Sequence, residues 1–323
     1  MQNCPLITIA ITCYNAEKTI EKAIKSALSQ DWSNYEIIVV DDCSNDKSID
    51  IINSLALNNT NIKVILSEKN SGVAIARNKL IEHANGEFIA FFDDDDESVS
   101  QRLTKQYRRI TEYEKKMQVE LVISHTARLQ IFPDGYRNYE ATIGNKTNAV
   151  VPHSIAVADQ ILIGRPMNEP VASCATCSQM ARKTSYIKVG NFNGLLRRSE
   201  DTDINVKFAL AGAHFVGIDE PLVLQNMTYT AEKNMNEERQ NALLFLDNHR
   251  TYLQKTGWYN HAHEWLDIKY DYLSGLKLRF LYRMVKLFVK SPKRTLQRLY
   301  WVWPNRQHSR MVANRNVEFH DER

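Results

Sequence analysis

The sequence has little cysteine and no long apolar run, and each shortage excludes a class of protein. Its 323 residues include five cysteines, an odd number at uneven spacing, with no secretory signal before them. We therefore expect no disulfide framework and a reducing, cytosolic setting. No window holds the roughly 20 apolar residues that a membrane-spanning helix needs, so we expect a soluble or peripheral protein.

Two glycine-rich phosphate-binding motifs are also missing. No G-x-G-x-x-G follows the first apolar run, and G-x-x-x-x-G-K-[ST] occurs nowhere. The sequence therefore lacks the motif that would indicate a dehydrogenase with a dinucleotide fingerprint or a P-loop NTPase. Cys174 and Cys177 have the spacing of a redox or half-zinc motif, but no second pair or paired histidines accompany them. We interpret both as ordinary buried thiols.

Short apolar runs alternate with helical periodicity between residues 6 and 97. This alternation predicts βαβ units and a mainly parallel sheet. With 43% hydrophobic residues, the chain can bury the core of one large domain, or of one domain with a helical appendage. The four apolar runs are residues 6–11, 37–40, 62–66 and 88–92.

Polar residues gather just after the first three of these runs. In a doubly wound sheet such positions meet at the carboxyl edge, where ligands bind, so we expect them to form one site. They are Thr12, Tyr14, Asn15, Asp41, Asp42 and residues 70–72.

An acidic run, residues 93–97, comes directly after the fourth apolar run. Crowding this much like charge at one strand end is costly without a cation. A solvated acidic loop is the alternative interpretation. The position between a strand and a helical pattern instead favours a site for a divalent cation and the phosphates attached to it.

The remainder of the chain gives weaker signals. Residues 121–124 and 128–132 are strand-like, near a turn at residues 133–135, and residues 145–168 are polar with little periodicity. We interpret the polar stretch as a mobile acceptor loop. A helix is expected from Glu200-Asp201, and helices are expected from about residue 234 to the end.

Several motifs, in this order, resemble the family 2 glycosyltransferases of GT-A fold. Each motif alone is a weak signal, but the ordered set is a strong one. The resemblance covers about the first 225 residues, and it is carried by residues 7–15, 38–44, 70–78, 92–97, 190–192 and 199–203.

The resemblance implies a GT-A α/β fold, with a mainly parallel sheet flanked by helices, and an inverting, metal-dependent sugar transfer from a nucleoside diphosphate donor, usually a UDP-sugar. By position, Thr12, Tyr14 and Asp42 would hold the nucleobase, and Arg77 would lie by the nucleotide. Asp41 is the alternative to Asp42. Without the resemblance, Arg77 would be interpreted as a surface ion-pair residue.

The acidic run matches the DXD element of the family. Asp93 and Asp94 would contact the nucleotide, and Asp95 would be the direct ligand of Mn²⁺ or Mg²⁺. Such an ion would act as a Lewis acid that neutralises the charge developing on a diphosphate leaving group.

Inversion needs a base on the acceptor side. The resemblance assigns that role to Asp201, whereas the residues alone equally allow Glu200 and Asp201 to stabilise the first turn of a helix. Two positions depart from the family pattern. No histidine occurs in residues 221–228, which leaves the metal shell beyond the acidic run in doubt, and Gly190-Asn191-Phe192 stands where Gly-Gly-Phe is common.

The C-terminal region is basic. Residues 272–317 contain no Asp or Glu, and one stripe of a predicted helix carries Arg279, Arg283, Lys286 and Lys290. With the aromatic group at 300–303, residues 276–303 predict attachment to an anionic membrane surface. The alternative is that the apolar stripe packs on the catalytic domain. Nucleic acid is a weaker interpretation, because the net charge is only +3 and no binding motif accompanies it.

These features predict a catalytic domain at residues 1–234 and a helical basic region at residues 235–323. The expected activity is transfer of a hexosyl or N-acetylhexosaminyl group to a glycan or lipid-linked acceptor, in bacterial surface polysaccharide assembly by analogy, on the inner face of the cell membrane. The alternatives are a nucleotidyltransferase that releases pyrophosphate and a non-catalytic module that binds sugar nucleotide or membrane.

Overall fold

The computed structural model describes residues 4–146, 150–167, 173–227 and 235–302. The chain divides into two compact units. Unit 1 comprises Met1–Val157 and Ala172–Thr228, and unit 2 comprises Ala158–Val171 and Tyr229–Arg323. The predicted boundary at residue 234 stays a prediction, and a segment from the middle of the chain groups with unit 2.

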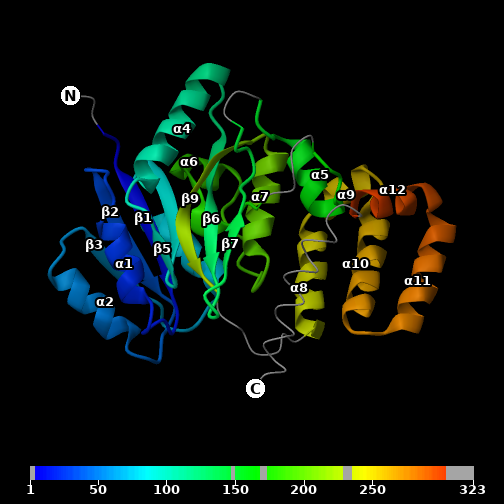
Figure 1. Cartoon of the computed structure of the whole chain (residues 1–323), viewed down its shortest axis with the longest axis horizontal. Helices are drawn as coiled ribbons and strands as arrows, with labels where there is room; N and C mark the ends of the chain where they lie inside the picture. The colour runs from blue at the N-terminus through cyan, green and yellow to red at the C-terminus, as the bar shows by residue number, and fades with distance from the viewer. Residues whose placement is uncertain (1–3, 147–149, 168–172, 228–234, 303–323) are drawn as a thin grey trace. The chain divides into compact units, whose positions relative to one another are not determined.

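Unit 1 contains a mixed sheet, which is nine-stranded in the part of the chain that the structure describes (Figure 1). Its order is β3-β2-β1-β4-β8-β6-β9-β5, with β7 paired to β6. The strands are β1 Ile7–Cys13, β2 Tyr35–Asp41, β3 Ile62–Leu66, β4 Phe88–Asp93, β5 Asp96–Ser98, β6 Val122–Ile131, β7 Arg137–Glu140, β8 Met180–Arg182 and β9 His214–Asn226.

The first four strands pair in parallel, which confirms the βαβ prediction. β1 lies between β2 and β4, so the carboxyl ends of the three strands meet at one edge. In this register Cys13 pairs with Asp41, and Thr12 pairs with Asp93. The sheet therefore brings together the polar residues that follow each strand.

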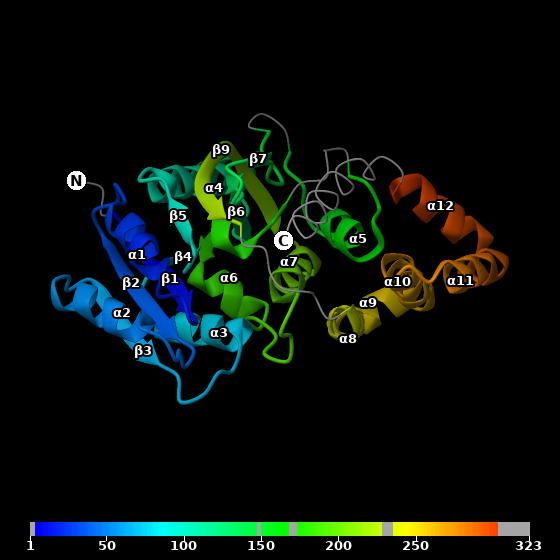
Figure 2. The same ribbon diagram turned by 60° about the horizontal axis from the view of Figure 1, so that its bottom comes forward.

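Helices cover both faces of this sheet and form the outer layers of the fold (Figures 1 and 2). Ile7, Ile9 and Ile11 alternate along β1 into a core shared with α1, α2 and α4. On the other face, the Phe91 ring meets Tyr186 of α6 edge to face at 5.5 Å. The helices of this unit are α1 Ile20–Leu28, α2 Ser48–Leu57, α3 Val73–His83, α4 Arg102–Met117, α6 Lys183–Lys188 and α7 Glu200–Leu210.

The two predictions for the middle of the chain have different outcomes. The strand-like runs at 121–124 and 128–132 are confirmed as strand, and both belong to one strand, β6, which pairs with β9 across a bulge at Thr126–Arg128. The interpretation of residues 145–168 as a loop is wrong in part. The stretch 145–168 contains helix α5, Ile155–Ile163, with Leu162 buried. Its periodicity was missed because the helix is short. Residues 147–149 and 168 of that stretch lie outside the described residues.

Unit 2 is helical, as predicted for the chain after residue 234. Helix α10 contacts α8, α9 and α11, and α11 contacts α12. Figures 1 and 2 show α8, α10 and α11 side by side. The five helices are α8 Met235–Asn248, α9 Arg250–Lys255, α10 Tyr259–Leu273, α11 Lys277–Lys290 and α12 Pro292–Val302.

Aromatic packing fixes α12 within unit 2. Trp301 packs on Trp258 with ring centroids 5.6 Å apart, and Arg298 lies over the ring of Trp265. The Trp301 ring therefore packs within unit 2. Trp303 and the basic residues beyond it lie outside the described residues. Among the helices described, none is both long and apolar enough to cross a membrane.

A buried guanidinium joins β4 to β5. Arg102 is fully buried and donates to the Phe91 carbonyl (2.7 Å), the Ser98 hydroxyl (2.9 Å) and the Gln106 amide oxygen (3.0 Å). Phe91 and Ser98 lie on either side of the acidic turn. Arg102 therefore holds the two strands at the spacing that shapes this turn.

We expect Arg102→Met to lower the free energy of unfolding by about 3 kcal/mol, because three buried acceptors lose their donor. The matched control is Arg108→Met on the exposed side of the same helix, which should change it by less than about 0.5 kcal/mol. Urea unfolding measures both values. Equal effects of the two substitutions would contradict this role for Arg102.

Candidate functional site

The acidic run forms the tight connection between β4 and β5. Asp93 ends β4, Asp94 and Asp95 form the turn, and Asp96 begins β5. β5 pairs with β9, where Asn226 donates from its side chain to the Asp95 carbonyl (2.8 Å) and from its backbone to Asp96 Oδ1 (3.1 Å). The four aspartates are therefore held in one turn.

Arg77 connects this turn to helix α7. Its guanidinium donates to Glu200 Oε1 at 2.8 Å and to Asp93 Oδ1 at 3.3 Å, and the residue is only 5% exposed. Burial alone would lower the pKa of Arg77, but the charges of Asp93, Glu200 and Asp201 raise it above its ordinary value. Arg77 is thus a buried ion-pair residue at the predicted site, not a surface one.

Asp42 organises the loop between β3 and α3. Its carboxylate accepts hydrogen bonds from the backbone N–H groups of Ser71 (3.0 Å) and Gly72 (2.6 Å). Gly72 has a φ of +92°, and a Cβ there would lie 2.8 Å from Nη1 of Arg197, so the loop requires glycine. Arg197 also donates to Asn70 Oδ1 at 3.1 Å.

Asp41 and Asp42 have separate positions. Asp41 is fully buried, and its carboxylate accepts from the backbone N–H and the hydroxyl of Ser44 within the loop that follows β2. Asp42 lies nearer the α3 loop, through the contacts with Ser71 and Gly72. The assignment of Asp42, and not Asp41, to the nucleobase stays a prediction.

The loop after β1 contacts both neighbouring strand ends. The Tyr14 backbone N–H donates to Asp94 Oδ2 (2.9 Å), while Asn15 Oδ1 accepts from the Asn45 N–H (2.8 Å). The Tyr14 side chain is 46% exposed, and Thr12 is half-buried beside Asp93. The strand ends are thus joined by hydrogen bonds into one continuous edge, and a large aromatic ring remains open to a ligand.

Asp201 lies in the first turn of α7, next to Glu200. Its Oδ1 accepts from the Thr202 N–H at 2.6 Å and from the Thr202 hydroxyl at 3.2 Å. The helix-stabilising contact of the alternative interpretation is therefore present. Both hydrogen bonds use Oδ1, and Oδ2 accepts no hydrogen bond from the residues that the structure describes. The structure brings Asp201 to the acidic turn through the Arg77–Glu200 pair.

The crowded carboxyls have displaced pKa values. Burial, with the charges of neighbouring aspartates, raises the pKa of Asp94 to about 7, that of Asp95 to about 6 and that of Asp96 to about 8. Burial also raises the pKa of Glu200, which the Arg77 charge opposes. The turn thus resists full ionisation unless positive charge is added.

These residues fit a hard divalent cation. Asp96 Oδ2 is buried without a hydrogen-bond partner among the described residues. Potential ligand atoms of Asp93, Asp96 and Cys177 lie within 4.8 Å of one another. Burial, then the charges of Asp93 and Asp96, raise the pKa of the Cys177 thiol, so it stays protonated and the oxygens are the better ligands. Asp95 is not in this group, and its role as direct ligand stays a prediction.

Sequence reasoning missed three contributors to the site. Glu200 was considered only as a helix-capping acid, Asp96 only as part of a run, and Asn226 only as part of a segment without histidine. The signal for Asn226 was its position: it ends β9, the strand that pairs with β5. Pairing between residues about 130 apart is not visible in local patterns.

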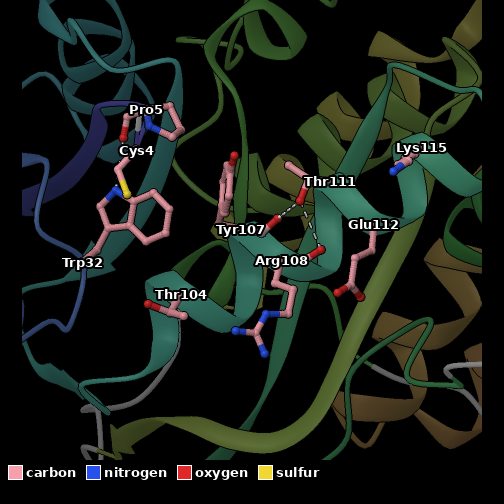
Figure 3. Close-up of a pocket in the computed structure, with 9 residues that line it drawn as sticks. All are labelled: Cys4, Pro5, Trp32, Thr104, Tyr107, Arg108, Thr111, Glu112 and Lys115. Carbon is pink, nitrogen blue, oxygen red and sulfur yellow. Dashed lines mark hydrogen bonds between the residues drawn. The ribbon is translucent and has the colours of Figure 1, made fainter. Parts of the chain in front are cut away.

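A surface hollow lies elsewhere on unit 1. Figure 3 shows Trp32 and Tyr107 facing this hollow, which has a volume of about 670 Å³ and adjoins Pro5. Pro5 precedes β1, whereas the aspartates follow the ends of β1 and its neighbours. The hollow therefore lies at the opposite end of β1 from the acidic turn and is not part of the candidate site.

One family model matches the N-terminal part of the chain. The model described as "Glycosyl transferase family 2" matches residues 8–155, a segment that includes the acidic turn. The match covers a little under half of the chain, so this segment is similar to that family. The identity of the acidic turn with the family's DXD element stays a prediction.

Two curated bacterial relatives support this assignment. Over 102 residues the chain is 41% identical to the "Putative teichuronic acid biosynthesis glycosyltransferase TuaG" of Bacillus subtilis, covering 32% of this chain and 40% of the relative. Over 101 residues it is 39% identical to the Escherichia coli "UDP-Glc:alpha-D-GlcNAc-diphosphoundecaprenol beta-1,3-glucosyltransferase WfgD", covering 31% and 39%. The chain thus spans about two fifths of the length of each relative.

A solved structure shows the same fold. S. aureus TarS 1-349, in complex with UDP-GlcNAc, superposes with a TM-score of 0.57 over 90% of this chain and 82% of that one. The two are 17% identical. At that identity the likeness supports the GT-A type fold and nothing finer.

The displaced pKa values predict a pH dependence of stability. In the unfolded chain these aspartates ionise near 3.8, whereas the folded turn keeps protons up to about pH 8. Because the folded state binds more protons, the carboxyls contribute a free energy of unfolding that falls as pH rises through this window. We expect the Tm of EDTA-treated protein to fall less steeply between about pH 5 and 8 in Asp96→Asn than in wild type.

The control is Asp50→Asn, at an exposed position on α2, which should keep the wild-type slope. Differential scanning fluorimetry at fixed ionic strength measures all three proteins. An unchanged slope in Asp96→Asn would show that its carboxyl does not resist ionisation.

Proposed function

We propose that this protein is an inverting glycosyltransferase that moves a sugar from a nucleoside diphosphate donor to an acceptor hydroxyl. The observation that carries the proposal is the joined carboxyl edge of the sheet, where Arg77 connects the acidic turn to Glu200 at the start of α7. In a family 2 domain, this arrangement provides a place for the diphosphate beside a carboxylate for the acceptor.

A UDP-sugar is the proposed donor. The TarS structure contains UDP-GlcNAc, and WfgD is named as using UDP-Glc; both facts support this donor class. The exposed Tyr14 ring offers a stacking surface for a base. Thr12 and Asp42 lie at the same edge of the sheet, and we assign them with Tyr14 to the nucleobase.

The acidic turn is the proposed diphosphate and cation site. Asp95 would be the direct ligand of Mn²⁺ or Mg²⁺, with Asp93 and Asp94 beside the nucleotide. When bound, such an ion supplies Lewis acidity toward the diphosphate oxygens. Arg77 keeps Asp93 at a fixed distance from α7 and balances part of the negative charge at the turn.

Asp201 is the proposed base. Its Oδ2 would accept the proton of the acceptor hydroxyl while that oxygen forms a bond to the anomeric carbon. The bond from the anomeric carbon to the phosphate oxygen breaks, and the nucleoside diphosphate leaves with the electron pair. The Thr202 N–H donates a hydrogen bond to Asp201 Oδ1. This bond keeps the Asp201 carboxylate in one orientation during the step.

The acceptor is proposed to be a glycan or a lipid-linked glycan, at the cytoplasmic side of a cell membrane. Support comes from the relatives: TuaG is named for teichuronic acid biosynthesis, and WfgD for a diphosphoundecaprenol acceptor. Donor sugar and linkage depend on individual side chains in the pocket.

The test is a panel of UDP-, GDP- and dTDP-sugars with Mn²⁺ and with a lipid-linked acceptor, followed by product analysis. We expect nucleoside diphosphate release from one donor. In Asp201→Asn, turnover should fall by about 10²- to 10⁴-fold, because the base is lost, while binding of UDP with Mn²⁺ is retained. In Asp95→Ala, that binding should weaken as well.

The control is Asp50→Asn, which should retain wild-type turnover. Release of pyrophosphate in place of a nucleoside diphosphate would identify a nucleotidyltransferase and overturn the proposal. Nucleotide binding with no turnover of any donor, even with lipid-linked acceptors, would identify a binding module instead.

A further inference from the structure

Helix α11 of unit 2 packs with one face and leaves another apolar face open. Its packed face includes Leu287, which is 1% exposed, and Phe280, whose ring lies 5.5 Å from that of Tyr272 at the end of α10. At 100° per residue, the open apolar face spans an arc of about 120°. It consists of Leu278 (86% exposed), Leu281 (58%), Tyr282 (67%), Val285 (55%), Phe288 (41%) and Val289 (76%).

Helix α12 continues this exposed apolar surface along the chain. Leu296 and Tyr300 are 55% and 78% exposed, one helical turn apart, and Lys293 precedes Leu296 by three residues. Thr295 and Leu287 lie inside unit 2. The two consecutive helices therefore each bury one face and expose apolar side chains on another, and grouped exposed apolar side chains are typical of an interaction surface.

The cations of α11, together with Lys293 of α12, belong to two groups. Arg279 and Arg283 form ion pairs with Asp271 of α10, and Lys290 pairs with Glu264 of the same helix. These three side chains hold the two helices together. Most of the basic stripe expected from the sequence is thus used within unit 2.

Three lysines form the second group. Lys277, Lys286 and Lys293 are exposed, and within the described part of the chain they have no hydrogen-bond or ion-pair partner. On the helical wheel, Lys286 lies about 40° from Tyr282, at the border of the open apolar face. Lys277 and Lys293 lie at the start of α11 and of α12.

The positive charge of this surface indicates what kind of partner binds to it. Residues 272–302 contain eight Lys or Arg and no Asp or Glu, although the whole chain is only +3. A second copy of the chain would place two such surfaces against each other and repel. An anionic lipid headgroup layer instead attracts the lysines, and its acyl boundary accepts the apolar side chains.

We propose that the open apolar face of α11, with Leu296, Tyr300 and the three unpaired lysines, binds an anionic lipid surface in the plane of the membrane. The inserted residues are Leu278, Leu281, Tyr282, Val285, Phe288 and Val289, and Lys277, Lys286 and Lys293 contact lipid phosphates. The paired arginines stay within unit 2. The inference is independent of the proposed enzymatic activity.

The experiment is cosedimentation of the full chain with vesicles of phosphatidylglycerol mixed with phosphatidylcholine, and with vesicles of phosphatidylcholine alone. Wild type should bind only the anionic vesicles, and high salt should weaken binding, since at 1 M the screening length is about 3 Å. Leu278→Glu with Val289→Glu should reduce binding by at least about tenfold, because both side chains belong to the inserted face. Both are highly exposed, so their replacement should leave the fold intact.

Two further variants separate the contributions. Lys277→Gln with Lys286→Gln and Lys293→Gln should weaken anionic binding by about 100-fold, at about fivefold for each lysine. The matched control is Leu57→Glu with Ile187→Glu, two exposed apolar residues of unit 1. It makes the same charge change as the α11 variant and should bind like wild type.

Three outcomes would overturn the proposal. One is failure of wild type to bind anionic vesicles, and another is equal loss in the α11 variant and the Leu57/Ile187 control. The third is wild type that sediments as a concentration-dependent dimer, becomes monomeric in Leu278→Glu with Val289→Glu, and does not bind vesicles. That result would assign the face to a second copy of the chain. Circular dichroism confirms that each variant is folded.

Discussion

The buried ion pairs of Arg77 are the constraint on which the rest of the site depends. One guanidinium joins Asp93 at the end of a central strand to Glu200 at the start of α7. These residues are more than 100 positions apart in the chain, and the two carboxylates would otherwise repel. Because a buried ion pair is strongly destabilising when one partner is removed, loss of Arg77 would leave two buried carboxylates without their shared cation.

Without a bound ligand, the acidic turn lowers the free energy of unfolding of the protein. Burial and mutual repulsion raise the pKa values of Asp94, Asp95 and Asp96, so the folded chain holds carboxyls in an environment that disfavours their charge. Arg102 behind the turn keeps β4 and β5 close and does not contact the carboxylates in place of a cation. Crowded carboxyls of this kind are typical of functional sites. At such sites the free energy of unfolding is lower than it would be with side chains chosen for stability alone.

Local sequence patterns predicted most of the first half of this fold. Alternation of apolar runs and helical stripes determined β1 to β4, and the sheet register then placed Thr12 beside Asp93. The Arg77–Glu200 pair and the Asn226 contacts could not be predicted in this way, since each joins segments far apart in the chain. Helix α11 shows the same limit: its basic stripe was visible, but its pairing with the acids of α10 depends on how two helices dock.

The proposed function requires that the joined carboxyl edge of the sheet bind a nucleoside diphosphate together with a divalent cation. Isothermal titration of UDP into the full chain, with Mn²⁺ and again with EDTA, measures this binding. We expect one UDP bound per chain with Mn²⁺, at least about tenfold weaker binding with EDTA, and the same loss in Asp93→Ala with Mn²⁺ present. Equal UDP affinity in all three conditions would contradict it.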